Sequence, residues 1–188
     1  MNRDPMHGTV EYMMVSDFYG TKRAKRSGLL LMNHINEGLY ILNRIQAPLS
    51  AKRAFCIHPL IQSDADLENM WTEVIANCDK TAIFLAVEYR NIANQYLSYR
   101  KITDISEIQL SPLDAVNKML YADKIQNYKD FLTHHNGKHP RSDELNLYFN
   151  NWLERLGIED IFEGWNESLH AEFDSDTEYN RFISKSAV

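Results

Sequence analysis

The strongest constraint on the fold is the spacing of apolar residues, which recur every three or four positions along most of the chain. This spacing places apolar side chains on one face of an α-helix and differs from the strict alternation of a half-buried strand. The sequence has only 7 glycines and 5 prolines in 188 residues, so it lacks the frequent turns of an all-β protein. We therefore predict an all-α fold.

Residues that start or stop helices divide this pattern into segments. Pro48 is expected to end one helix. Asp64, Ser111 and Ser142 are expected to cap later ones, and Gly157 to end the last of these. The expected helices cover residues 5–17, 29–45, 49–59, 81–99, 111–132 and 142–157, with a further helix that begins at Asp64.

Length and composition fit a single domain over residues 1–188. A chain of 188 residues is typical of one domain, and 44% hydrophobic residues can supply its core. No internal repeat, low-complexity segment or long linker divides the sequence. We expect one compact helical unit, with aromatic residues concentrated in its last sixty positions.

Net charge, cysteine content and hydropathy limit the cellular environment and the kinds of partner that we expect for this chain. A net charge of -6 argues against general nucleic-acid binding. Cys56 and Cys78 form no C-x-x-C pair and we recognise no signal peptide, so we expect reduced thiols in a cytoplasmic protein. No apolar run reaches ~18 residues, so we expect no membrane-spanning helix. An oligomer is possible, because the aromatic C-terminal third can cover a partner or the chain's own core.

Three ionisable residues fall on apolar helical faces. His34 borders the apolar stripe of its helix, His58 ends the run Ala-Phe-Cys-Ile, and Asp123 shares a face with Asn127 one turn later. A lone histidine on such a face is most often a satisfied core group, and a lone aspartate a cap or ion-pair partner. Two histidines and a carboxylate that point inward from three helices predict a ligand set for a divalent ion.

The order of three motifs resembles the HD-domain phosphohydrolases. The segments "KRSGLLLMNHI", "AFCIHP" and "YADKIQN" are similar to the motifs of the (p)ppGpp hydrolase (RelA/SpoT-type) branch of that superfamily. His34 and His58 are separated by 24 residues, as in the family, and Asp123 and Asn127 by four. The resemblance covers an HD-like core at about residues 22–132. We identify no counterpart for a C-terminal helical extension at 142–185.

The resemblance implies a metal centre and a phosphate-binding loop. The implied ligands of a divalent ion (Mn, Fe, Zn, Co or Ni) are His34, His58 and Asp123. The implied substrate-binding residues are Lys25, Arg26, Ser27 and Asn127. The basic segment at 22–26 has a simpler interpretation as a solvated turn before a helix.

Two departures from the family pattern affect the expected chemistry. Pro59 stands where the family has the aspartate of its His-Asp pair, so one metal ligand is missing. Gln62 and Ser63 stand where the family has the acidic pair that positions the attacking water, and neither is a general base like a carboxylate. Asp64 and Asp66 are the replacement candidates at this position, together with Gln62. Alternatively, the two aspartates belong to the start of the next helix.

A second group of basic residues lies in "THHNGKHPRSDEL" at residues 133–145. It contains no cysteine and no H-E-x-x-H pattern, so it does not predict a zinc site. Its cations can bind a substrate phosphate together with Lys25 and Arg26, or form an ordinary polar loop between helices.

The sequence leaves three functions open. The first is a metal-dependent phosphohydrolase that acts on a nucleotide or alarmone-like phosphate ester. The second is a degenerate HD domain that binds a nucleotide or a protein partner without turnover. The third is an all-α interaction module in which the motif matches are accidental. No motif reads a base or a sugar, so the sequence does not identify the substrate.

Overall fold

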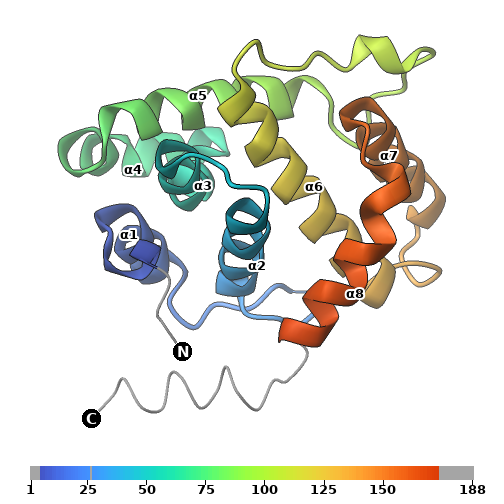
Figure 1. The fold of residues 1–188 in the computed structure, drawn as a ribbon, viewed down its shortest axis with the longest axis horizontal. Helices are drawn as coiled ribbons and strands as arrows, with labels where there is room; N and C mark the ends of the chain where they lie inside the picture. The colour runs from blue at the N-terminus through green and yellow to red at the C-terminus, as the bar shows by residue number, and fades with distance from the viewer. Residues whose placement is uncertain (1–4, 26, 174–188) are drawn as a thin grey trace.

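The computed structural model describes residues 5–25 and 27–173, and its regular elements in this part of the chain are all helical (Figure 1). The all-α prediction is confirmed. Among the described residues, no helix combines the length and apolarity needed to cross a bilayer. The elements are η1 (Pro5–Gly8), α1 (Val10–Tyr19), α2 (Leu31–Arg44), α3 (Leu49–Ile61), α4 (Asp64–Asn77), α5 (Lys80–Gln95), η2 (Ile105–Glu107), α6 (Asp114–His134), α7 (Ser142–Leu156), η3 (Glu159–Ile161) and α8 (Phe162–Phe173).

Helix α3 is the centre of the molecule. It packs against α1, α2, α4, α5 and α6, and residues 54–61 are all buried. A helix that is apolar on every side must be surrounded in this way. Helix α6 packs beside α2 and connects this central group to α7 and α8, which lie on the other side of α6 (Figure 1).

Helices α2 and α3 approach each other closely at one glycine. A Cβ atom added to Gly38 would lie 2.1 Å from the ring of Phe55, so no larger residue fits without movement. Gly38 is one helical turn after His34, and Phe55 is nearly one turn before His58. This contact therefore sets the distance between the two helices that carry the histidines.

Several predicted helix ends differ from the structure because side chains bond elsewhere. Helix α4 is capped by Ser63, whose hydroxyl accepts from the Asp66 backbone N–H (3.0 Å), so the prediction of Asp64 as cap is wrong. Helix α6 begins at Asp114 without a side-chain cap, because Ser111 instead donates its hydroxyl to Glu88 (2.8 Å).

Three further helix boundaries differ from the predicted ones. Ser142 is the first residue of α7 rather than its cap, and its hydroxyl accepts from the Gly137 backbone N–H (2.7 Å). Helix α5 ends at Gln95 rather than Tyr99, where the backbone of Tyr96 becomes extended. Helix α3 continues through Pro59 to Ile61, although Pro59 was expected to end it. The prediction that Gly157 ends α7 is confirmed, because it adopts the left-handed conformation there.

Candidate metal centre

His34 enters the site from the start of α2, and Gln126 of α6 orients its ring. The Gln126 Oε1 atom lies 2.6 Å from His34 Nδ1. The Gln126 Nε2 atom donates to the carboxylates of Glu37 (3.2 Å) and Asp130 (2.8 Å). Because carboxylates only accept, the amide oxygen faces His34 and Nδ1 carries the proton. In the neutral ring the His34 Nε2 atom is then the acceptor.

His58 is oriented in the same way by a backbone group. Its Nδ1 atom lies 2.6 Å from the carbonyl oxygen of Phe55, one turn earlier in α3. A carbonyl can only accept, so Nδ1 donates and Nε2 keeps its lone pair. The side chain is almost fully buried, at 5% exposure. Both histidines thus direct their Nε2 atoms away from their own helices, and in a neutral ring with the proton on Nδ1 this nitrogen carries the free lone pair.

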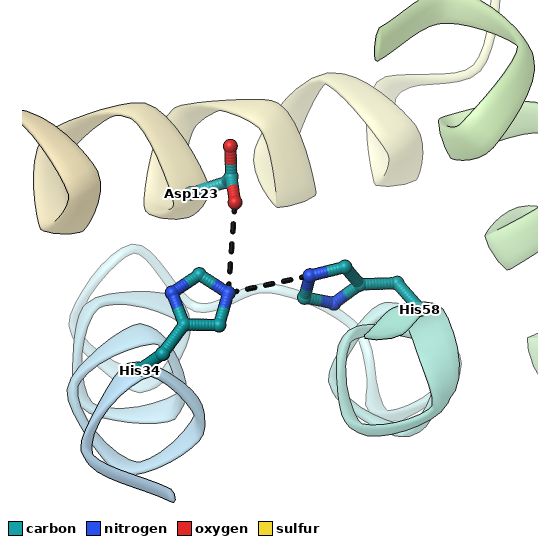
Figure 2. A group of neighbouring side chains, drawn as sticks. All are labelled: His34, His58 and Asp123. Atoms are coloured by element: carbon teal, nitrogen blue, oxygen red, sulfur yellow. Dashed lines mark hydrogen bonds and ion pairs between the residues drawn. The ribbon is translucent and has the colours of Figure 1, made fainter. Parts of the chain in front are cut away.

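These two nitrogens and a carboxylate oxygen of Asp123 meet between α2, α3 and α6 (Figure 2). The Nε2 atoms of His34 and His58 are 3.3 Å apart, and His34 Nε2 is 3.6 Å from Asp123 Oδ1. All three ligand atoms lie within 4.8 Å of one another. The structure therefore brings together the three residues that the sequence predicted as ligands.

The protonation states of the buried ligands suit a metal ion. Burial is the largest cause that lowers the pKa of His58 to about 3, and the neighbouring His34 also lowers it, so His58 is neutral at pH 7. Burial opposes ionisation of Asp123, but the adjacent Lys124 ammonium is the largest of the effects that outweigh burial and lower the pKa of this carboxyl to about 2. A neutral imidazole and an ionised carboxylate are the forms that bind metals.

Other polar groups hold the Asp123 carboxylate in place. The Asn127 amide donates to Oδ1 (2.9 Å) and the Lys124 ammonium lies 2.8 Å from Oδ2. The Tyr89 hydroxyl also donates to this carboxylate, and its ring packs 4.9 Å from that of His58. Burial, and then the charge of Asp123, raises the pKa of Tyr89, so it remains a donor.

Lys124 is a buried cation beside the site. Its ammonium contacts the Tyr148 hydroxyl (3.2 Å) and lies 5.0 Å from the centre of the Trp152 ring. Burial by itself would lower the pKa of Lys124, but the charge of Asp123 raises it above the usual range. Sequence analysis missed Lys124, Gln126 and Tyr89. Their adjacency to Asp123 in "YADKIQN" was the available signal for the first two.

A cavity of about 440 Å³ opens beside the metal ligands. His34 and Asp123 line it, and so do two of the predicted substrate-binding residues, Ser27 and Asn127. Its volume is within the usual range for small-molecule sites. Lys25 is exposed and does not line this cavity. Arg26 lies outside the described residues. The apolar part of the wall comes from Tyr19, Ala24, Leu29, Leu30, Leu31, Phe131, Leu145 and Phe149.

The residues predicted to orient the attacking water lie outside this cavity. The Gln62 side chain donates to Asn94 (2.7 Å). The Asp64 side chain is 97% exposed and pairs with Arg90. Asp66 accepts from the Ser63 hydroxyl (2.5 Å) at the start of α4. Both aspartates therefore contribute to the first turn of α4, where negative charge favours the helix dipole.

The basic loop between α6 and α7 borders the same cavity through one residue. His135 lines both the cavity beside the metal ligands and a second, open cavity of about 620 Å³. Lys138, His139 and Arg141 line the second cavity, and Arg141 also pairs with Glu144 (2.7 Å). The loop therefore places cations at the C-terminal end of α6.

None of the protein-family models, curated proteins and solved structures compared with this chain matched it. The interpretation of the site therefore depends on its own geometry and chemistry.

Proposed function

We propose that this chain is a metal-dependent phosphohydrolase of HD type that acts on a nucleotide or another phosphate ester. His34, His58 and Asp123 hold one divalent ion, which is Mn, Fe, Zn, Co or Ni in this proposal. The observation that carries the proposal is the convergence of two imidazole nitrogens and a carboxylate oxygen, three potential acceptor atoms, within 4.8 Å of one another. Such atoms repel one another unless a cation binds among them.

A proton is the simplest rival to a metal ion at this position. If His34 were doubly protonated, its Nε2–H would donate to His58 or to Asp123. One proton can satisfy only one of these two acceptors well, whereas a metal ion binds all three ligand atoms. Histidine ligands of metals also commonly donate their other N–H to a carbonyl or amide oxygen. Both His34 and His58 do so.

A bound divalent ion would supply Lewis-acid polarisation of a phosphoryl oxygen. The Asn127 amide and the Ser27 hydroxyl line the adjoining cavity and can donate hydrogen bonds to a phosphate. The two aspartate candidates for orienting water, Asp64 and Asp66, do not line this cavity.

A second candidate function is nucleotide binding without turnover by a degenerate HD domain. The position of Lys124 favours it, because the ammonium already neutralises the Asp123 carboxylate at 2.8 Å. Pro59 and Gln62 also replace carboxylates of the family pattern. Within residues 5–25 and 27–173, the cluster contains no second carboxylate beside Asp123. In this alternative the cavity holds a ligand that is not hydrolysed.

Metal analysis tests the proposal directly. Protein purified without chelator and supplied with Mn should contain about one equivalent of metal, and Asp123→Ala should remove most of it. Asp114→Ala is the matched control, since Asp114 lies at the start of the same helix with its side chain 79% exposed. Less than about a tenth of an equivalent, unchanged by added Mn, would count against any metal site.

Turnover separates the two candidate functions. Release of phosphate or pyrophosphate from a nucleotide panel, abolished by His58→Ala, supports the hydrolase. A melting temperature that rises with a nucleotide, without any release of phosphate, supports the degenerate domain, because a ligand that binds only the folded state stabilises it.

A further inference from the structure

Pro59 leaves one buried carbonyl of α3 without its usual partner. It lies inside the helix, which continues to Ile61. Because proline has no backbone N–H, the carbonyl of Phe55, four residues earlier, receives no helical hydrogen bond from position 59. Phe55 is fully buried, at 0% exposure. An unpaired carbonyl at such a place is costly, so another donor is required.

The donor that meets this carbonyl is the side chain of His58. Its Nδ1 atom lies 2.6 Å from the Phe55 oxygen. The ring of a proline within a helix also clashes with the carbonyl four residues earlier, which tilts that carbonyl away from the helix axis. A tilted carbonyl without a helical donor is well suited to accept from a nearby side chain.

We propose that Pro59 is a positioning residue for His58. By removing the backbone donor, Pro59 reserves the Phe55 carbonyl for the Nδ1–H of His58, and this bond commits the Nε2 atom to the metal centre. The proline therefore replaces a carboxylate ligand of the family pattern with a fixed orientation of the neighbouring histidine. The inference concerns the metal-free protein, and it depends on the proposed function only where metal binding is the readout.

A different residue at position 59 should weaken the hydrogen bond between His58 Nδ1–H and the Phe55 carbonyl. Any residue except proline brings an N–H that points along the helix at the Phe55 oxygen. This N–H competes with His58 for the carbonyl. The imidazole then becomes free to rotate or to change tautomer, and its Nε2 lone pair spends less time directed at His34 and Asp123. We therefore expect α3 to form normally, while the His58 side chain becomes a weaker metal ligand.

The test is Pro59→Ala in the full chain, with Pro48→Ala as the matched control. Pro48 is the exposed residue that precedes α3, so its replacement frees no carbonyl inside the helix. Nitrogen NMR of ¹⁵N-histidine-labelled, metal-free protein reports the tautomer of each ring, and His58→Ala identifies the signals of His58. In the unchanged chain and in Pro48→Ala, His58 should show a single tautomer with the proton on Nδ1.

In Pro59→Ala, the His58 signals should shift toward a mixture of tautomers. Affinity for Mn, measured by calorimetric titration, should fall about tenfold, which is typical when the outer partner of a histidine ligand is lost. The melting temperature should not fall with it, because the helix gains a backbone hydrogen bond. If Pro59 had only a structural role, its replacement would not lower the affinity for Mn while leaving the melting temperature unchanged or higher.

Two results would overturn the inference. One is an unchanged His58 tautomer in Pro59→Ala, and the other is Mn affinity within about twofold of the unchanged chain. If no variant and no form of the chain binds Mn, the proposed metal site fails. The tautomer measurement on metal-free protein still decides the role of Pro59 in that case.

Discussion

Single residues determine how the three ligand atoms are directed. Gln126 is fully buried and makes three hydrogen bonds, which fix its amide orientation and through it the tautomer of His34. The amide orientation of Gln126 and the tautomer of His34 cannot be predicted from the sequence. A glutamine at a buried helical position breaks the apolar pattern without indicating its hydrogen-bond partners. The positions of His34 and Asp123 were predictable from their place on apolar faces. Their protonation states depend on neighbours that only packing brings together.

Replacement of Gln126 by leucine should weaken metal binding and stability together. The change removes the acceptor of His34 Nδ1–H and a donor to two carboxylates. We expect affinity for Mn to fall about tenfold and the free energy of unfolding by about 1–3 kcal/mol. Calorimetric titration and urea unfolding measure the two effects. Gln109→Leu, at an exposed position, serves as control. Unchanged Mn affinity in Gln126→Leu would contradict this role.

Buried His58 should make the metal-free protein sensitive to acid. Burial lowers the pKa of His58 from its ordinary value of 6.5 to about 3 in the folded chain. As the pH falls from 6.5 toward 3, His58 becomes protonated in the unfolded chain but stays neutral in the folded chain. The free energy of unfolding therefore decreases by up to about 1.4 kcal/mol per pH unit. His58→Gln should show a flatter profile over this range in urea unfolding. Equal slopes in both proteins would contradict the prediction.

The lowered pKa of Asp123 extends this acid sensitivity to lower pH. The carboxyl has a pKa of about 2 in the folded chain, below its ordinary value of 3.8. Its stabilising contribution is complete above pH 3.8 and is lost as the pH falls through 2. Asp123→Asn should therefore lose less stability over this lower range. Parallel profiles would contradict the prediction.

At the scale of helices, the apolar spacing predicted where helices form, but it did not predict which polar side chains they bury. Helix α6 buries polar residues on several sides, including Asp123, Lys124 and Lys129. Lys129 pairs with Glu37 of α2 at 2.7 Å, so two charges are satisfied by each other between helices. An apolar stripe cannot predict such pairs, because each partner by itself looks like a surface residue. Helix ends were missed for a related reason, since Ser111 bonds to Glu88 from a different helix.

The contact between α2 and α3 should control both packing and metal binding. In Gly38→Ala, the new methyl group would overlap the ring of Phe55 at 2.1 Å, so the two helices or the ring must move. We expect the free energy of unfolding to fall by about 1–3 kcal/mol, with weaker Mn binding because His34 and His58 separate.

Gly164→Ala is the control for this change. Gly164 lies within α8, and a Cβ atom there meets no other atom within 4 Å. It should raise stability slightly, by up to about 1 kcal/mol, because alanine favours a helix more than glycine does. Equal effects of the two alanines in urea unfolding would show that the α2–α3 contact has no special role.

At the scale of the whole molecule, distant segments meet in one site. Residues 34, 58 and 123 come from three helices, and their convergence was predictable from inward-facing positions and from the family resemblance. The C-terminal extension at 142–185 has no counterpart in the family resemblance, and the sequence predicted no role for it. Instead, Tyr148 and Trp152 of α7 cover Lys124, so this segment encloses the ion pair with Asp123. Residues 174–185 of the predicted extension lie outside the described residues.

The most direct test of the account is the position of a metal ion relative to the three ligands. Crystals grown with Mn and measured at its absorption edge should show one strong anomalous peak. It should lie about 2.0–2.3 Å from His34 Nε2, His58 Nε2 and a carboxylate oxygen of Asp123. A structure at the same Mn concentration without that peak, in which Nε2 of His34 instead donates a hydrogen bond to Asp123, would contradict the account.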